Sequence, residues 1–450
     1  MTTTLTNDTI TAIATANGIG SIAIIRISGD KALEIVSKLT HKNSFSPRYA
    51  SLTNVYNTQD ELIDESLVIY FQAPHSFTAE DVVEIQCHGG FIVAQSILKA
   101  SVEAGARLAE SGEFSKRAFF NGRIDLSEAE AIAGLIEAKS EDAAKILAKQ
   151  MKGSLKEFIE EVRDEIIHIL AYSEVSIDYA EEDLPEDLVK QIMQKLQKLS
   201  KDLEKTLQVS KSRAGLMQGF RVAIVGKPNV GKSSLLNALL SYDRAIVSEI
   251  AGTTRDTIEE SVKIGTHLIR MVDTAGIRVA DDEIERIGIE RSLEAIKECD
   301  IVVALFDNSR IKDEEDAQIF SLIKSHKDEK KVIYVNNKID LEKKFDDEQL
   351  LFDLKLNSKV DVTPLIEILQ NYMDITNSSD EIMLISQRQI SAVEATLQNI
   401  QESYLPLKSQ ELEIFSFHLN VALKEMASIT RPFENDEMLD KMFGSFCLGK

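Results

Sequence analysis

The stretch Gly226–Ser234, which reads GKPNVGKSS, decides the fold of the middle of the chain. It fits the pattern G-x-x-x-x-G-K-[ST] and stands between an apolar run, RVAIV, and a helix-forming run, SLLNALL. In such a strand–loop–helix, backbone N–H groups at the helix N-terminus bind phosphate. We expect Lys232 to reach the β and γ phosphates and the Ser233 hydroxyl to bind Mg²⁺. The stretch therefore predicts an α/β domain that binds a nucleotide.

Three further segments indicate the base and the reaction. DTAG (Asp273–Gly276) follows the run HLIRMV, and its aspartate is expected to hold Mg²⁺ through water. NKID (Asn337–Asp340) follows VIYVN, and Asp340 can accept two hydrogen bonds from guanine that adenine cannot supply. AGTTRD (Ala251–Asp256) lies where a switch loop belongs, and Thr254 would complete the Mg²⁺ shell. Their order and spacing predict GTP binding.

Two features of this domain depart from the usual pattern. Asn357-Ser358-Lys359 stands where Ser-Ala-Lys is usual, which leaves the base contacts there open. Ras-type GTPases carry a glutamine after D-x-x-G to orient the attacking water, but here Ile277 occupies that position. The stretch RVADDEIERIGIERS supplies Glu283, Glu285 and Arg286 to position the water, although these residues also suit a solvated acidic helix start. Arg255 and Arg278 are candidates for an arginine finger, and a bound cation, held with the help of the Asn229 side chain, would substitute for one.

The pattern of the chain changes along its length. Short β-rich runs with glycine-marked turns begin it and indicate an α+β domain. Apolar residues then recur at i, i+3, i+4 and i+7, which predicts long amphipathic helices with a break at Leu184-Pro185. Strand-like runs alternate with helices next, and helical periodicity returns at the end, so an α/β domain interrupts one helical domain. The predicted parts are residues 1–122 (α+β), 123–218 (helical, first part), 219–377 (α/β G domain) and 378–450 (helical, second part, with the tail CLGK).

The composition limits the class of protein. The 450 residues carry a net charge of −23, from 51 basic and 74 acidic residues, which argues against general electrostatic binding of nucleic acid. Three widely spaced cysteines, Cys87, Cys299 and Cys447, form neither a disulfide framework nor a zinc spacing. No secretory signal pattern and no apolar run near the roughly 20 residues of a membrane span occurs. We expect a cytoplasmic protein without a membrane partner.

Beyond these motifs the chain shows a resemblance. GKPNVGKS and AGTTRD resemble translation-factor-like GTPases, which include ribosome-assembly GTPases. SIAIIRISG, SFTAEDVVEIQCHGG, GEFSKRAFFNGRIDLSEAEAIAGLI, DTAGIR, DEIERIGIERS and the closing FCLGK resemble the MnmE (TrmE) family of tRNA modification GTPases. The resemblance implies a tetrahydrofolate-binding, dimerising N-terminal domain, and potassium-dependent GTP hydrolysis when two G domains meet across a homodimer. It also implies a heterotetramer with MnmG, which brings FAD, and modification of C5 of the tRNA wobble uridine.

The resemblance also implies roles for single residues. Asn229, Ser248, Ile250 and Thr253 match the potassium ligands, Ser233 and Thr254 the Mg²⁺ ligands, and Glu285 the residue that orients water. Arg26, Glu84, Arg123 and Lys450 match folate contacts of 5-formyl- or methylene-tetrahydrofolate, although ATANGIG departs from the proline-glycine-rich loop of relatives. The expected GTP-binding residues are Asn229, Val230, Gly231, Lys232, Ser233, Ser234, Ser248, Glu249, Ile250, Ala251, Gly252, Thr253, Thr254, Asp273, Thr274, Ala275, Gly276, Asn337, Lys338 and Asp340.

The cysteines are expected to differ in role. A thiolate can add to C6 of uracil and make C5 more nucleophilic, and Cys447 has Lys450 near it in sequence to lower its pKa. Cys447 is therefore a candidate catalytic residue in a tail that packs beside the folate site. The alternative is a small apolar residue that anchors the tail. Cys87 and His88 are adjacent on a strand and should face opposite sides, so Cys87, like Cys299, is expected in the core.

Two functions remain open on these grounds. The first is an enzyme that couples GTP hydrolysis to tRNA wobble-uridine modification. The alternative is a ribosome-assembly GTPase switch without one-carbon chemistry. Arg26, Glu84, Arg123 and the CLGK tail distinguish them, because a switch has no use for a folate pocket.

Overall fold

The computed structural model describes residues 8–16, 18–138, 140–178, 186–212, 214–242, 260–272, 296–297, 299–325, 330–345, 352–377, 381–431, 436–446 and 449. They form two compact units. The first contains residues 1–136, 150–196 and 391–450, and the second contains residues 137–149 and 197–390. Each unit therefore draws on segments that are far apart in the sequence.

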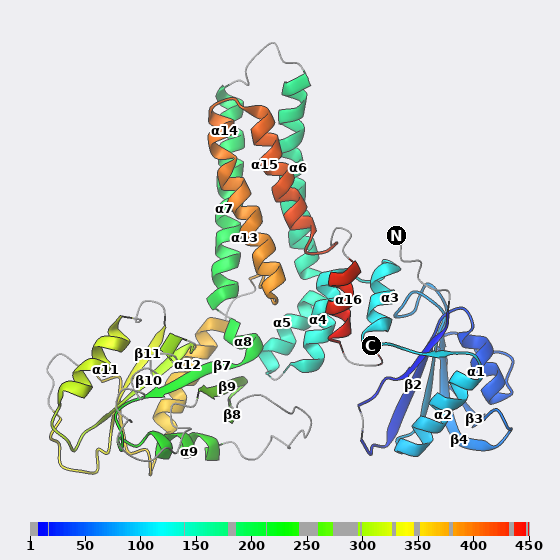
Figure 1. Ribbon diagram of the computed structural model, residues 1–450, viewed down its shortest axis with the longest axis horizontal. Helices are drawn as coiled ribbons and strands as arrows, with labels where there is room; N and C mark the ends of the chain where they lie inside the picture. Colours follow the sequence, from blue (N-terminus) through cyan, green and yellow to red (C-terminus); the bar gives the residue numbers. More distant parts are fainter. Residues whose placement is uncertain are drawn as a thin grey trace. The chain divides into compact units, whose positions relative to one another are not determined.

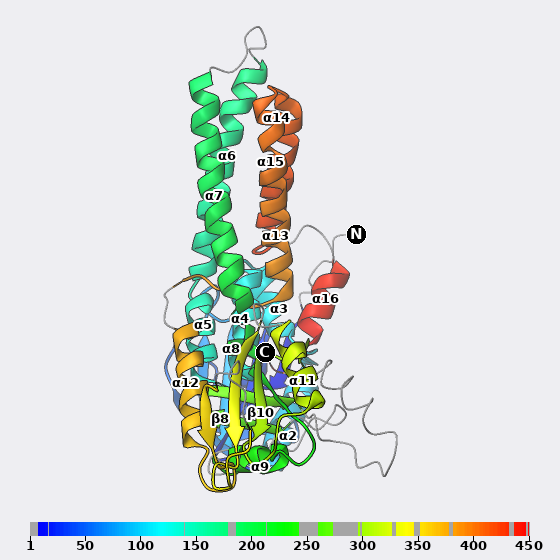
Figure 2. The same cartoon turned by 90° about the vertical axis from the view of Figure 1, so that its left-hand side faces the viewer.

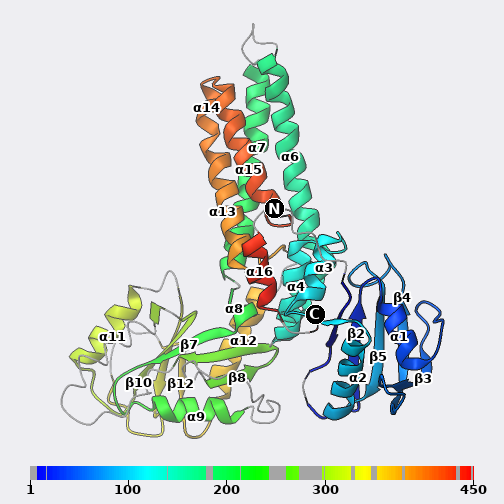
Figure 3. The same cartoon turned by 45° about the vertical axis from the view of Figure 1, so that its right-hand side comes forward.

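The first unit contains a six-stranded, mostly antiparallel sheet with the strand order β3-β4-β5-β2-β1-β6. β1 also pairs with β6 in parallel. The helices α1 and α2 lie along one face of this sheet (Figure 3). The bounds are β1 Ile10–Ile13, β2 Ile22–Ser28, α1 Ala32–Thr40, β3 Ser51–Tyr56, β4 Leu62–Phe71, β5 Val82–His88, α2 Phe91–Glu103 and β6 Arg107–Leu108.

Alternation along the strands divides this sheet into two faces. On β5, Val83, Ile85 and Cys87 are buried against the helices, while Glu84 and His88 lie on the opposite face. The pleat of a strand requires this, because successive side chains point to opposite sides. The predicted burial of Cys87 is confirmed, and the α+β character of the domain is confirmed with it.

Long helices make up the rest of the first unit and reach into the second. α6 (Ser154–Asp178) lies beside α15 (Leu412–Ala427), although the whole G domain separates them in sequence (Figures 1 and 2). The predicted helical domain in two segments is confirmed by this packing. The break expected at Leu184-Pro185 lies between α6 and α7, outside the described residues. The other bounds are α3 Glu113–Phe120, α4 Leu126–Glu137, α5 Glu141–Met151, α7 Glu186–Ser212, α13 Gln387–Glu402, α14 Tyr404–Lys408 and α16 Asp436–Gly444.

The second unit is built on a six-stranded sheet with the strand order β12-β11-β10-β7-β9-β8. Buried apolar runs such as β10, IVVALFD, form its centre, as parallel strands covered on both faces require. α9 and α12 pack on one face and α11 on the other. The bounds are α8 Ala214–Gln218, β7 Phe220–Val225, α9 Lys232–Tyr242, β8 Glu260–Ile264, β9 His267–Val272, β10 Ile301–Asp307, α11 Glu314–Lys324, β11 Lys331–Asn337, β12 Leu354–Leu356 and α12 Thr363–Asn377.

The predicted α/β G domain is thus confirmed, with one addition at its edge. β8 pairs with β9 in antiparallel fashion, whereas β7, β9, β10, β11 and β12 run parallel. The two strands form a hairpin that lies between AGTTRD and DTAG in the sequence. Among the described helices, none is long and apolar enough to cross a membrane.

Candidate functional site

The phosphate loop joins the end of β7 to the start of α9. The Lys232 Nζ donates to the carbonyl oxygens of Gly226, at 2.6 Å, and of Lys227, at 2.9 Å. Burial lowers the pKa of Lys232. Gly231 has φ +108° and any Cβ there would run into the Asn337 amide, so this turn requires glycine. The loop therefore has the close-packed geometry and the lysine that phosphate binding needs.

A second lysine holds the middle of the same loop. The Lys338 Nζ donates to the Asn229 carbonyl and to Asp307 Oδ2, at 2.7 Å in each case. Burial alone would raise the pKa of Asp307, but hydrogen bonds from Lys338 and Ser309 lower it. Asn229 has φ +65°, a left-handed conformation that asparagine tolerates better than most residues. Its exposed side chain stands at the edge of the loop, where a potassium ligand is expected.

The NKID segment and the atypical Asn357-Ser358-Lys359 element lie together. The buried Asn337 amide donates to the Val230 carbonyl at 2.7 Å and to Ser358 Oγ at 3.0 Å. The Ser358 N–H donates in return to Asn337 Oδ1 at 2.9 Å. Asp340 is exposed beside them, as a carboxylate that reads a base edge should be. The hydroxyl of Ser358 thus ties the unusual element to the base-recognition segment.

An acidic clamp on the phosphate loop was not predicted from the sequence. The Lys227 Nζ lies 2.6 Å from Asp313 Oδ2 and 2.7 Å from Asp316 Oδ2. Burial alone would lower the pKa of Lys227, but the two carboxylates raise it. Asp313 and Asp316 also form a capping box at the start of α11. The sequence offers one signal for this clamp, because Lys227 lies inside the phosphate-loop pattern. The pattern does not identify the acidic partners of that lysine.

Several expected residues of this site lie outside the described residues. They are Ser248, Glu249, Ile250, Ala251, Gly252, Thr253 and Thr254 in the first loop, Asp273, Thr274, Ala275 and Gly276 in the second, and Glu285 after it. The alternatives Glu283, Arg255, Arg278 and Arg286 and the position Ile277 lie there too. Ser233 and Ser234 are described and occupy the first turn of α9.

A second polar site lies on the open face of the first sheet. Arg26 and Glu84 face each other across β2 and β5, and the Arg26 Nη2 lies 2.8 Å from Glu84 Oε1. The Arg26 guanidinium sits 5.6 Å from the ring centroids of both Phe77 and Phe114. The two expected folate-contacting residues are thus paired and flanked by aromatic rings, which suits a flat heterocycle with hydrogen-bonding edges.

The end of the chain returns to this site. The Arg26 Nη1 donates to the Gly449 carbonyl at 3.3 Å. Gly449 is buried, has φ +89°, and any Cβ there would run into the Ile13 carbonyl. Its glycine is therefore required for the tail to lie against β1. The neighbours Cys447 and Lys450 lie outside the described residues.

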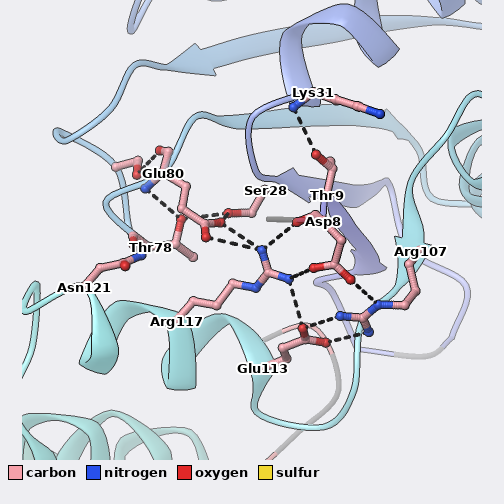
Figure 4. Close-up of polar contacts among 11 residues, drawn as sticks. Asp8, Thr9, Ser28, Lys31, Thr78, Glu80, Arg107, Glu113, Arg117 and Asn121 are labelled. Carbon is pink, nitrogen blue, oxygen red and sulfur yellow. Dashed lines mark hydrogen bonds and ion pairs between the residues drawn. The ribbon is translucent and has the colours of Figure 1, made fainter. Parts of the chain in front are cut away.

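A network of charges connects α3 to the segment that contains Thr78 and Glu80 (Figure 4). Arg117 on α3 is buried and pairs with Asp8 at 2.6 Å, Glu80 at 3.2 Å and Glu113 at 3.1 Å. Arg107 also binds Asp8 and Glu113, at 2.7 Å in each case. Glu80 belongs to the segment SFTAED, which also contains Phe77. The network thus fixes the segment whose ring stacks on Arg26.

The third expected folate contact reaches the same segment. The Arg123 Nε donates to the Ser76 carbonyl at 3.3 Å, directly before Phe77. The Asn121 amide donates to the carbonyl of Thr78, the residue directly after Phe77, at 2.7 Å. Arg123 is therefore held next to the residues that surround Arg26, although no direct contact between Arg123 and Arg26 is found among the described residues.

The two described cysteines are packing residues. Burial raises the pKa of Cys87 to about 11 and that of Cys299 to about 11, so neither is a thiolate at neutral pH. His88 is exposed, with its Nδ1 2.7 Å from Asp64 Oδ1. This pair stands at the end of β5, where a strand-end turn was expected.

Two solved structures are similar to part of the chain. Era in complex with MgGDPNP and a segment of 16S ribosomal RNA is 26% identical, with a TM-score of 0.26, over 40% of this chain and 66% of that chain. The FeoB G domain from Methanococcus jannaschii is 20% identical, with a TM-score of 0.24, over 36% of this chain and 98% of that chain.

Family models and relatives cover nearly the whole chain. The model described as GTP-binding protein TrmE N-terminus matches residues 9–123, and the MnmE helical domain model matches residues 126–447. The tRNA modification GTPase MnmE of Sulfurimonas denitrificans is 75% identical over 99% of this chain and 100% of the relative. That of Aliarcobacter butzleri is 60% identical over 99% of both. With a P-loop, an NKID segment and an arginine–glutamate site in the expected places, the chain belongs to the MnmE (TrmE) family of tRNA modification GTPases.

Proposed function

We propose that this chain hydrolyses GTP in a potassium-dependent reaction as a homodimer. Together with MnmG, in a heterotetramer, it adds an aminomethyl or carboxymethylaminomethyl group to C5 of the wobble uridine of cytoplasmic tRNA. A tetrahydrofolate one-carbon unit supplies the carbon, and FAD is expected on MnmG. The observation that carries this proposal is that Arg26 contacts Glu84, the Gly449 carbonyl and two phenyl rings. A GTPase that acted purely as a switch has no need of it.

The folate site is tested by titration calorimetry with 5-formyltetrahydrofolate. The Arg26–Glu84 pair offers donors and a carboxylate to the amide-like edge of a pterin, and the rings of Phe77 and Phe114 flank it. We expect saturable heat, with affinity at least tenfold weaker in Glu84→Gln because one charged partner is lost. Glu110→Gln, an exposed carboxylate of the same domain, is the matched control. No heat at millimolar ligand would favour the ribosome-assembly switch instead.

The potassium site is tested by comparing GTPase rates in KCl and in NaCl. Asn229 offers a side-chain oxygen at the edge of the phosphate loop, and Ser248, Ile250 and Thr253 are its proposed co-ligands. Because φ is +65° at Asn229, an alanine there would add backbone strain of about 1–2 kcal/mol to the loss of a ligand. Asn229→Gly removes the ligand without that strain. We expect it to bind GTP and to lose the preference for potassium, and equal wild-type rates in the two salts would refute the assignment.

The hydrolysis step needs a group that orients water. Glu285 is proposed for this role, while Ser233 and Thr254 hold Mg²⁺ and Asp273 contacts it through water. Glu285→Gln keeps the size of the side chain but removes the negative charge. We expect kcat to fall at least tenfold with little change in the affinity for a non-hydrolysable GTP analogue, because the residue acts on water and not on the nucleotide. A parallel loss of affinity would contradict this role.

The tail is proposed to take part in the modification. The Gly449 carbonyl bonded to Arg26 supports a position of the tail beside the folate site, and Lys450 is proposed as a folate contact there. The Cys447 thiolate would add to C6 of the uracil ring and leave again when C5 has been substituted. Cys447→Ser with intact GTPase activity and unchanged wobble modification would assign the residue to packing. Mass spectrometry of wobble uridines from cells lacking the gene tests the whole proposal.

A further inference from the structure

The tip of the β8–β9 hairpin contains a buried histidine with an unsatisfied ring nitrogen. His267 opens β9 and is 1% exposed. Its Nε2 lies 2.8 Å from Asp374 Oδ1 on α12, and the Phe220 ring packs edge-on at a centroid distance of 5.9 Å. Its Nδ1 has no hydrogen-bond partner although it is buried. A buried polar atom in this condition is unfavourable and requires an explanation.

The group that faces this nitrogen belongs to helix α5. Asp142 Oδ2 lies 3.6 Å from the His267 Nδ1, just beyond hydrogen-bonding distance. The same oxygen accepts a hydrogen bond from the Thr266 hydroxyl at 2.6 Å, and the Lys145 Nζ lies 3.1 Å from the other oxygen. Asp142 has only 3% of its side-chain surface exposed. The first turn of α5 is therefore docked on the hairpin tip through one buried carboxylate.

A second contact connects the start of α5 to α8, the short helix before the strand that leads to the phosphate loop. The Ser140 hydroxyl accepts a hydrogen bond from the Ala143 N–H at 3.1 Å and donates to the Leu216 carbonyl at 3.3 Å. Leu216 lies in α8, directly before β7. All of these residues belong to the second unit, and the chain enters the first unit after Lys149. α5 is thus a direct covalent route from the nucleotide domain to the rest of the chain.

The position of the hairpin connects this contact to the nucleotide site. β9 pairs in parallel with β7, whose end carries the phosphate loop, and Val272 at the end of β9 precedes Asp273 in sequence. A change of the bound nucleotide that displaces β9 along β7 also displaces Thr266 and His267 against Asp142. A shift of roughly 0.5 Å or more would bring the His267 Nδ1 within hydrogen-bonding distance of that carboxylate. Such a shift would give the junction a second discrete arrangement, which a coupling element requires.

We propose that Asp142, Thr266 and His267 are positioning residues that couple the nucleotide state of the G domain to helix α5. In one state Asp142 accepts a hydrogen bond from Thr266 while the His267 Nδ1 is unsatisfied, as in this structure. In the other state the single ring hydrogen is on Nδ1 and is donated to Asp142, while the Asp374 carboxylate, 51% exposed, takes its hydrogen bonds from water. Because coupling between two sites is reciprocal, the junction must in turn bias which nucleotide the protein prefers. This inference rests on GTP binding and not on the folate or potassium chemistry.

The test measures the ratio of the dissociation constants for fluorescent GDP and for a fluorescent non-hydrolysable GTP analogue, on the full-length protein. His267→Phe keeps the ring and its packing on Phe220 but removes both nitrogens. Asp142→Asn keeps the size of the side chain and removes its charge. Glu141→Gln is the matched control, because Glu141 is on the same turn, 62% exposed, and 3.7 Å from Lys263 of the same hairpin. An exposed ion pair of this kind contributes little to stability.

We expect His267→Phe and Asp142→Asn to change the ratio by about fivefold or more in the same direction, and Glu141→Gln to leave it unchanged. The double variant should change the ratio no more than the larger single effect, because both residues act through one contact. A merely structural role would weaken both nucleotides equally and leave the ratio fixed, which would overturn the proposal. If His267→Phe fails to fold, Asp142→Asn decides alone.

A second measurement needs no variant. Hydrogen–deuterium exchange of the α5 amides, residues 141–149, is compared between the GDP-bound and the analogue-bound wild-type protein. We expect at least a threefold difference in the exchange rates of amides in this helix. Identical exchange in the two states would overturn the proposal, whatever the variants show.

Discussion

The acidic clamp on Lys227 allows a prediction whose size follows from burial. Lys227 and Asp316 expose 6% and 3% of their side-chain surfaces, whereas Asp313 exposes 55%. Removing one member of a buried ion pair costs about 3–5 kcal/mol because the other charge stays buried and unpaired, and an exposed pair is worth about 0–1 kcal/mol. We therefore expect Lys227→Met to lower the local stability of the phosphate loop and of the start of α11 by about 3 kcal/mol. Asp313→Asn should lower it by less than about 1 kcal/mol.

Hydrogen–deuterium exchange of the full-length protein measures this local opening without assuming that several domains unfold together. About 3 kcal/mol corresponds to exchange that is roughly 100-fold faster in the protected amides of these segments. Lys227→Met/Asp316→Asn should recover most of the protection, because its buried carboxylate is gone, and an asparagine oxygen can still accept the hydrogen bond from the Asp313 N–H. The affinity for a GTP analogue should follow the same order. Less than threefold faster exchange in Lys227→Met, or a double variant no better than the single one, would refute this reasoning.

Three further predictions concern the base element, the tail and acid stability. Ser358→Ala removes the hydroxyl that accepts from Asn337, so we expect about fivefold weaker GTP binding by calorimetry, worth about 1 kcal/mol, whereas Lys355→Ala, an exposed position outside the element, serves as the control. Gly449→Ala cannot keep its left-handed backbone against β1, so binding of 5-formyltetrahydrofolate should weaken at least tenfold while GTP binding stays unchanged. Burial alone would raise the pKa of Glu113, but hydrogen bonds from Arg107, the Glu110 N–H and Arg117 lower it below its ordinary 4.5. The stability that this shift adds is complete above pH 4.5 and is lost as pH falls through the lowered pKa. The protection of α3 amides against exchange should therefore fall in acid below pH 4.5, and should fall less steeply with pH in Glu113→Gln.

The fold was predictable where apolar residues form a continuous run or alternate with polar residues. β7, β10 and β11 each contain a continuous apolar run (VAIV, IVVALF and VIYV), as strands buried on both faces require. The alternation in β5 predicted that Cys87 and His88 face opposite sides. The antiparallel edge strand β8 was not predicted, because a five-residue strand beside a turn carries little periodicity. The pairing of β1 with the two-residue β6 was not predicted for the same reason.

Pairings between distant charges could not be predicted from periodicity. Arg117 and Asp8 are 109 positions apart, and Lys227 and Asp313 are 86 positions apart. A lone charged residue in sequence reads as part of a solvated surface, since burial of the charge is tolerable only once its partner is known. Arg26 and Glu84 were assigned from a resemblance alone. The register of the β2–β5 pair places these two residues opposite each other, and that register cannot be read from the sequence.

The phosphate loop shows why three lysines near it have different roles. Lys227 and Lys338 are each neutralised by carboxylates of the segment Asp307–Asp316, which joins β10 to α11. Lys232, in contrast, contacts two neutral carbonyls, and no carboxylate pairs with it among the described residues. Burial without a counter-charge lowers its pKa, and a triphosphate in the loop would supply that charge. The two paired lysines therefore fix the shape of the loop, while Lys232 has no carboxylate partner among the described residues and is left for the nucleotide. Replacing Lys232 should abolish GTP binding and loosen the loop less than replacing Lys227 does, because it removes hydrogen bonds to neutral carbonyls and leaves no buried carboxylate unpaired.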